Sequence, residues 1–170
     1  MTLAEAAAEA DALAQRGAER ELAALRTEWQ DELEGAARST DFRERAVAYK
    51  AIGQFRFRQK LELLARGLED ESPACRGSAL VSLELLSRDH PGAINTLRST
   101  LHKLVDSDPQ MAVRRLALVC LRNGPARGDT IGILQGIAEN DEADKEVQAT
   151  AAAVLTALKK KIDQRQGERR

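Results

Sequence analysis

The sequence predicts an all-α protein built as a stack of similar helical hairpins, and three observations support this prediction. The chain has 170 residues, of which 43% are hydrophobic but only 3% aromatic, so its core must be built from Leu, Ala, Val and Ile. Ala and Leu dominate while Pro and Gly are sparse, a composition typical of helices. A motif made of an acidic turn and a helix with an apolar stripe recurs over residues 70–83, 106–121 and, more weakly, 140–155.

Residues 1–38 are predicted to form an N-terminal amphipathic helical segment. Thr2 is the expected N-cap, and Glu5 three positions later completes a capping box. Arg16-Gly17 separates two apolar stripes, so the segment is either two helices or one weakened helix. Up to residue 40 it carries nine Asp or Glu against four Arg. Two interpretations stay open: a cap on the stack that buries Trp29 against the first hairpin, or a protruding helix that forms a homodimer.

Periodicity and turn signals place the remaining helices in order. Ser39 or Thr40 caps a helix over 41–53, which Gly53 ends, and the next helix covers 55–68. Pro73 follows an acidic turn and opens a helix over 73–88, since a helix does not need the missing N–H at its first position. Further helices are expected over 93–105, 109–121, 130–139 and 143–162. Residues 164–170 have no apolar anchors and are expected to be a mobile tail.

The second helices of successive hairpins align with one another. The aligned triplets are Arg45-Ala48-Ile52, Arg76-Ala79-Leu83, Arg114-Ala117-Leu121 and Gln148-Ala151-Leu155. Their first members are separated by 31, 38 and 34 residues, and a recurrence in this range indicates a helical solenoid. One hairpin cannot bury its apolar face alone, so neighbours stack into a continuous core.

This pattern resembles HEAT repeats in their short bacterial form. That family's second helix opens with Asp-x-x-Pro, then Val-Arg, a small residue and Leu. The two matching copies are Asp70, Pro73, Arg76, Ala79 and Leu83, and Asp106, Pro109, Val113, Arg114, Ala117 and Leu121 with two extra residues after the proline. The resemblance implies an armadillo-type, right-handed α-α superhelix of about four hairpins, with residues 39–163 as the solenoid. It also implies that the recurring Asp and Arg bond neighbouring repeats and turn backbone.

The resemblance further implies a scaffold or adaptor that binds another protein or peptide on a concave face lined by second helices. The expected partner contacts are side chains that the core does not need: Lys50, Ser82, Glu84, Arg88, Arg115 and Arg122. A nucleic-acid-binding module is the alternative, with basic clusters at residues 56–60, 114–115 and 159–161. The net charge of -1 and the absence of interleaved aromatic residues count against nucleic acid.

No catalytic, cofactor or metal site is expected. The chain has no glycine-rich phosphate loop, no Gly-x-Ser-x-Gly elbow and no His-Glu-x-x-His pair. Its two Cys and two His are scattered and do not make a zinc pattern, so Cys75 and Cys120 are expected to be small buried core residues. No signal peptide and no apolar run near 20 residues is visible, which favours a cytoplasmic protein without a membrane span.

Overall fold

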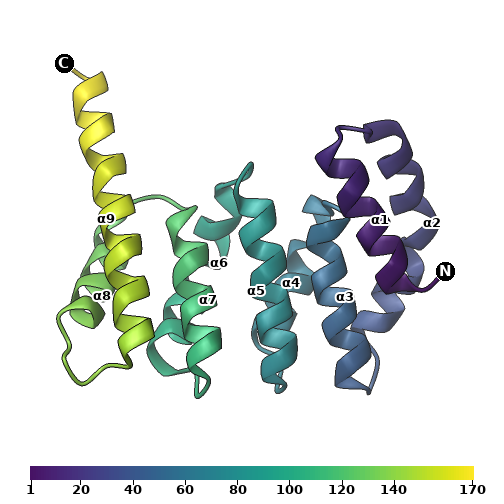
Figure 1. The fold of residues 1–170 in the computed structure, drawn as a ribbon, viewed down its shortest axis with the longest axis horizontal. Coiled ribbons are helices and arrows are strands. Elements are labelled where there is room, and N and C mark those ends of the chain that lie inside the picture. The colour runs from purple at the N-terminus through teal and green to yellow at the C-terminus, as the bar shows by residue number, and fades with distance from the viewer. The chain divides into compact units, whose positions relative to one another are not determined.

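The computed structural model describes residues 1–170 and confirms the all-α prediction. It contains nine α-helices and one short 3₁₀ helix, without a β-strand (Figure 1). The helices cluster into two compact units, Met1–Leu86 and Ser87–Arg170, called unit 1 and unit 2 below. None of the nine helices combines the length and the apolar character that crossing a membrane requires.

The N-terminal segment consists of two helices, α1 (Leu3–Gln15) and α2 (Glu19–Ala37). The predicted capping box is present: the Oγ1 atom of Thr2 accepts from the N–H of Glu5 at 3.2 Å, and Glu5 Oε2 accepts from the N–H of Thr2 at 2.7 Å. Gly17 separates the helices with a φ of 70°, a left-handed conformation that glycine adopts at no steric cost. Both helices pack on α3 (Phe42–Gln54), and Trp29 is buried.

The prediction of one helix over residues 55–68 is wrong for the first half of that range. Phe55 and Phe57 are both buried with ring centroids 5.4 Å apart, whereas residues two apart on a helix do not share a face. The chain instead turns at Arg56, whose φ is 57°, before η1 (Arg58–Lys60) and α4 (Leu61–Leu68). The guanidinium of Arg56 offsets this strained conformation by donating to two carbonyls at the end of α3 and to the carboxylate of Asp11.

Helix α5 (Pro73–Ser87) begins at Pro73, as the sequence predicts, and approaches α3 closely. The hydroxyl of Ser82 is fully buried, accepts from the N–H of Gly53 at 2.9 Å and donates to the carbonyl of Tyr49. A Cβ atom at Gly53 would lie 2.7 Å from the Cα of Ser82. Only glycine at position 53 therefore allows this spacing between α3 and α5.

Unit 2 holds α6 (Gly92–Ser107), α7 (Met111–Arg122), α8 (Gly128–Ala138) and α9 (Lys145–Glu168). Helix α7 packs against α6, and α9 packs against both α7 and α8 (Figure 1). The expected helix start at Pro109 is wrong, because Asp108 Oδ1 accepts from the N–H of Gln110 at 2.9 Å and holds Pro109 in a turn before the helix. Both cysteines are free thiols in the core, as predicted.

The expected end of the last helix at Ile162 is also wrong, since α9 continues to Glu168. Residues 163–168 contain no proline and consist mostly of Gln, Arg and Glu, which have good helix propensity. Their side chains are exposed, so the end of α9 is held by its own backbone hydrogen bonds rather than by packing. The mobility of residues 164–170 stays a prediction.

Candidate functional site

The same pattern of hydrogen bonds holds each of the four turns that precede the second helix of a hairpin. A side-chain oxygen at the start of the turn accepts from the backbone N–H two residues later, at 2.9 to 3.1 Å. A long side chain from the following helix donates to carbonyls of the same turn. The four acceptors are Ser39, Asp70, Asp108 and Asn140, and the four donors are Arg45, Arg76, Arg114 and Gln148.

Asp70 also bonds the preceding repeat, as the resemblance implies. Its carboxylate forms a bidentate ion pair with Arg45, with Nε–Oδ2 at 2.9 Å and Nη2–Oδ1 at 3.0 Å. Both side chains are largely buried, at 8% exposed for Asp70 and 13% for Arg45. Burial raises the pKa of Asp70, but the hydrogen bonds from Arg45 and from the N–H of Ser72 outweigh it and hold the pKa below its usual value. These bonds link two neighbouring repeats and hold the turn before α5.

The assignment of Asp106 as the repeat carboxylate is wrong. Asp106 is exposed, whereas Asp108 is 4% exposed and caps the turn before α7. The spacing between the repeat Asp and the repeat Arg could have identified the correct residue. Asp70 precedes Arg76 by six residues, and Asp108 precedes Arg114 by the same number. Aligning the two copies of the motif on their prolines, instead of on their arginines, placed the repeat carboxylate two residues too early.

The predicted partner contacts in unit 1 are Lys50, Ser82 and Glu84. Ser82 is unavailable to a partner, because it is buried and bonds the backbone of α3. Lys50 is exposed on α3, and Glu84 is half-buried on α5. The sequence could not separate these cases, because an amphipathic stripe does not reveal which polar residue meets a neighbouring helix.

The predicted partner contacts in unit 2 are Arg88, Arg115 and Arg122. Arg88 and Arg122 are exposed. Arg115 pairs with Glu146 of α9 at 2.8 Å, and both side chains are well exposed, so this pair contributes little stability. A role for Lys50, Glu84 and these three arginines in partner binding stays a prediction.

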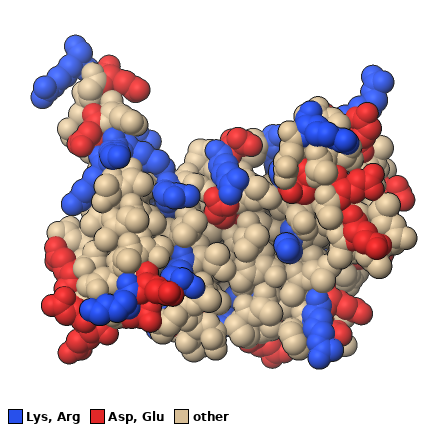
Figure 2. All heavy atoms as spheres, in the orientation of Figure 1, with Lys and Arg blue, Asp and Glu red and all other residues tan.

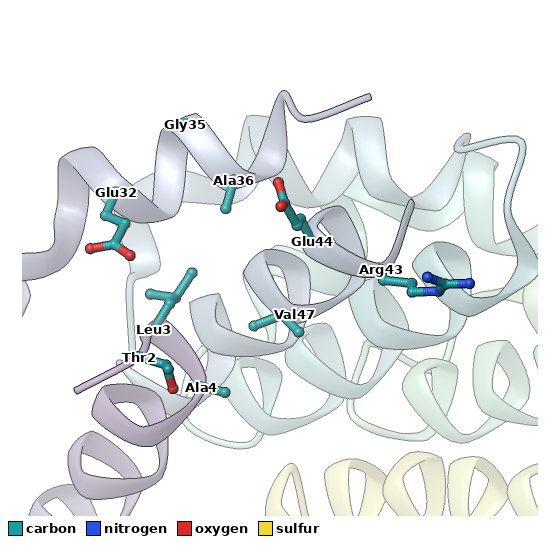
Figure 3. Close-up of a pocket in the computed structure, with 9 residues that line it drawn as sticks. All are labelled: Thr2, Leu3, Ala4, Glu32, Gly35, Ala36, Arg43, Glu44 and Val47. Atoms are coloured by element: carbon teal, nitrogen blue, oxygen red, sulfur yellow. The ribbon is translucent and has the colours of Figure 1, made fainter. Parts of the chain in front are cut away.

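Unit 1 contains an apolar groove that the sequence did not predict. It has a volume of about 800 Å³ and lies between the start of α1, the end of α2 and the start of α3 (Figure 3). Its lining residues are Thr2, Leu3, Ala4, Glu32, Gly35, Ala36, Arg43, Glu44 and Val47. Since three helices contribute, no single stretch of sequence carries its signal.

The groove has an apolar floor and acidic sides. Leu3, Ala36 and Val47 form the floor, and Val47 is 38% exposed although it is a large aliphatic residue. Glu32 and Glu44 lie on either side of Ala36, and the side chain of Arg43 points away from them (Figure 3). Neither carboxylate has an ion-pair partner. Gly35 adds open space, because a Cβ built there meets no atom within 4 Å.

Several contacts hold the walls of the groove in place. Arg26 on α2 donates to the carbonyl of Phe55 at 2.6 Å, and Arg56 pairs with Asp11 on α1 at 2.9 Å. Lys60 pairs with Glu34 on α2 at 2.5 Å, and this hydrogen bond holds the pKa of Glu34 below its usual value. The groove is therefore preformed, which lowers the entropic cost of binding.

No cluster of three or more His, Cys, Asp or Glu side chains is placed to hold a metal ion. A search of curated proteins finds no match to the chain. Residues 30–107 match the family model of HEAT repeats. The matched segment begins within α2 and ends with α6, and it contains two of the four turns described above. Residues 30–107 therefore carry HEAT repeats.

Proposed function

We propose that the protein is a non-catalytic scaffold that binds a segment of another protein in the groove of unit 1. HEAT repeats are commonly protein-interaction scaffolds, and the family is generally non-catalytic. The single observation that carries the proposal is the preformed apolar groove between α1, α2 and α3, with unpaired carboxylates on two sides.

The chemistry of the groove specifies the partner. Its floor favours aliphatic side chains, because covering the exposed Val47 and the half-buried Ala36 removes apolar surface from water at about 25 cal/mol per Å². Glu32 and Glu44 favour a partner segment that carries Lys or Arg on either side of its aliphatic residues. An amphipathic helix with apolar residues at i and i+3 or i+4 and basic flanks meets both requirements.

Selection of helical peptides from a displayed library, followed by affinity measurement, tests this function. We expect enriched peptides to combine an apolar stripe with basic flanks. Gly35→Trp fills the open space and should weaken binding at least tenfold, or about 1.4 kcal/mol. Gly35→Ala is the matched control and should bind as the wild type does. Peptides that bind Gly35→Trp and the wild type equally would refute the groove as the docking site.

The sequence also allows a homodimer through residues 1–38, and a different measurement tests it. The apolar faces of α1 and α2 already pack against each other and against α3, so we expect a monomer in light scattering. A dimer that Val47→Asp dissociates would mean that the occupant of the groove is a second copy of this chain.

A further inference from the structure

A second pocket lies in unit 2, and every charged side chain in its lining is positive. It has a volume of about 480 Å³ and is formed by the start of α6, the loop between α7 and α8, and α9. Arg127, Lys161 and Arg165 line it without an Asp or Glu, and none of the three has an ion-pair partner. The C-terminal part of α9 adds further Lys and Arg (Figure 2). A set of cations in a concave site that has no acidic residue in its lining favours an anion.

Lys161 is held in the wall of this pocket with one donor to spare. Its ammonium donates to the carbonyl of Arg122 at 2.5 Å and to that of Gly124 at 2.9 Å. An ammonium group has three N–H donors, so the third is available to a ligand. Burial lowers the pKa of Lys161, and repulsion from Arg165 and Arg122 lowers it further. A bound anion would offset both effects.

The start of α6 contributes one backbone donor, the N–H of Gly92, to the same pocket. The residue before the helix is Pro91, and no side chain caps the helix N-terminus. The N–H groups of Ala93 and Ile94 bond carbonyls of the preceding turn, whereas that of Gly92 makes no such bond. A Cβ built at Gly92 meets no atom within 4 Å, so a ligand can approach the backbone there. The helix dipole adds to the positive potential.

We propose that this pocket binds a phosphate monoester carried by a partner protein, such as a phosphorylated serine or threonine. A phosphate monoester carries a charge near −2 and three acceptor oxygens, which suits a pocket lined by several cations and a backbone N–H. A carboxylate has a single charge and two oxygens. Nucleic acid is less suited, because the lining offers no aromatic side chain on which a base could stack. The proposal does not depend on the groove in unit 1.

Nitrogen-15 NMR at constant ionic strength tests the proposal. The probes are a short phosphoserine peptide, its unphosphorylated form and its Glu variant. We expect the phosphopeptide to shift the Gly92 amide saturably, and the other two peptides to shift it little. Arg127→Gln and Lys161→Gln should each weaken binding at least tenfold, or about 1.4 kcal/mol. Arg127→Gln removes neither of the bonds that Lys161 makes to the carbonyls of Arg122 and Gly124, so it is informative even if Lys161→Gln unfolds.

The control variant is Lys159→Gln, which removes one exposed charge from α9 outside the pocket lining and should bind as the wild type does. Equal weakening by Lys159→Gln and Arg127→Gln would mean that only the general positive potential is involved, and would overturn the site. An equal response to the Glu peptide would overturn the preference for phosphate. Tighter binding of a single-stranded oligonucleotide at these amides would assign the site to a phosphodiester backbone instead.

Discussion

Replacing Asp70 by Asn tests how the stack is held together. The substitution keeps the shape and an oxygen for the N–H of Ser72, but it removes the charge that pairs with Arg45 in two hydrogen bonds. Hydrogen bonds to charged groups contribute about 1.5 to 3 kcal/mol each, and removal of one partner from a buried pair costs about 3 to 5 kcal/mol. Arg45 keeps its bonds to the carbonyls of Ser39 and Thr40. We therefore expect unit 1 to lose about 2 to 3 kcal/mol.

The assay is urea unfolding followed by the fluorescence of Trp29, the only tryptophan in the chain. It is buried in unit 1, so its emission reports the unfolding of that unit. Asp31→Asn removes an exposed carboxylate on α2 and serves as the control, with an expected change within about 0.5 kcal/mol.

The pH dependence follows from the lowered pKa of Asp70. A carboxyl with a depressed folded pKa contributes stability above its unfolded pKa of about 3.9, and this stability is lost as the pH falls through the folded value. The cost of Asp70→Asn should therefore be full near neutral pH and shrink at about pH 2.5. A cost below about 0.5 kcal/mol at neutral pH, or one that stays constant in acid, would refute the reasoning.

Three further substitutions test individual contacts. Gly53→Ala should destabilise unit 1 by about 1 to 3 kcal/mol in the Trp29 assay, because its Cβ would lie 2.7 Å from the Cα of Ser82; no loss would mean that α3 and α5 can move apart. Gly35→Ala should stabilise the same unit by about 0.5 to 1 kcal/mol, since alanine favours the helix and meets no atom; a loss would contradict the open space. Asp108→Ala should lower the stability of unit 2 by about 1 to 3 kcal/mol in circular dichroism, whereas Asp106→Ala should change it by less than about 0.5 kcal/mol; the reverse order would restore Asp106 as the repeat carboxylate.

Local patterns in the sequence predicted the helices well. The capping box at Thr2 and the helix start at Pro73 depend on neighbouring residues, so periodicity and cap chemistry identified them. The turn at Arg56 could not be found this way. Its left-handed conformation depends on Asp11, 45 residues earlier, and on the burial of the two flanking phenylalanines. Tertiary contacts outweighed local helix propensity there.

The candidate sites were less accessible to sequence reasoning. Lys50 lies on α3 three residues after Val47, so the prediction came within one helical turn of the groove without naming its lining. The groove combines α1, α2 and α3, and the pocket in unit 2 combines Gly92, Arg127 and Lys161 from distant stretches. Each of these residues alone has the pattern of an ordinary surface position.

Photo-crosslinking of a selected peptide tests the docking site most directly. A benzophenone side chain is placed at Val47 in the groove, or at Glu62, an exposed residue of α4 in the same unit that does not line it. We predict a crosslink from position 47 that free peptide competes away, and none from position 62. A crosslink from position 62, or equal yields from both positions, would contradict a docking site between α1, α2 and α3.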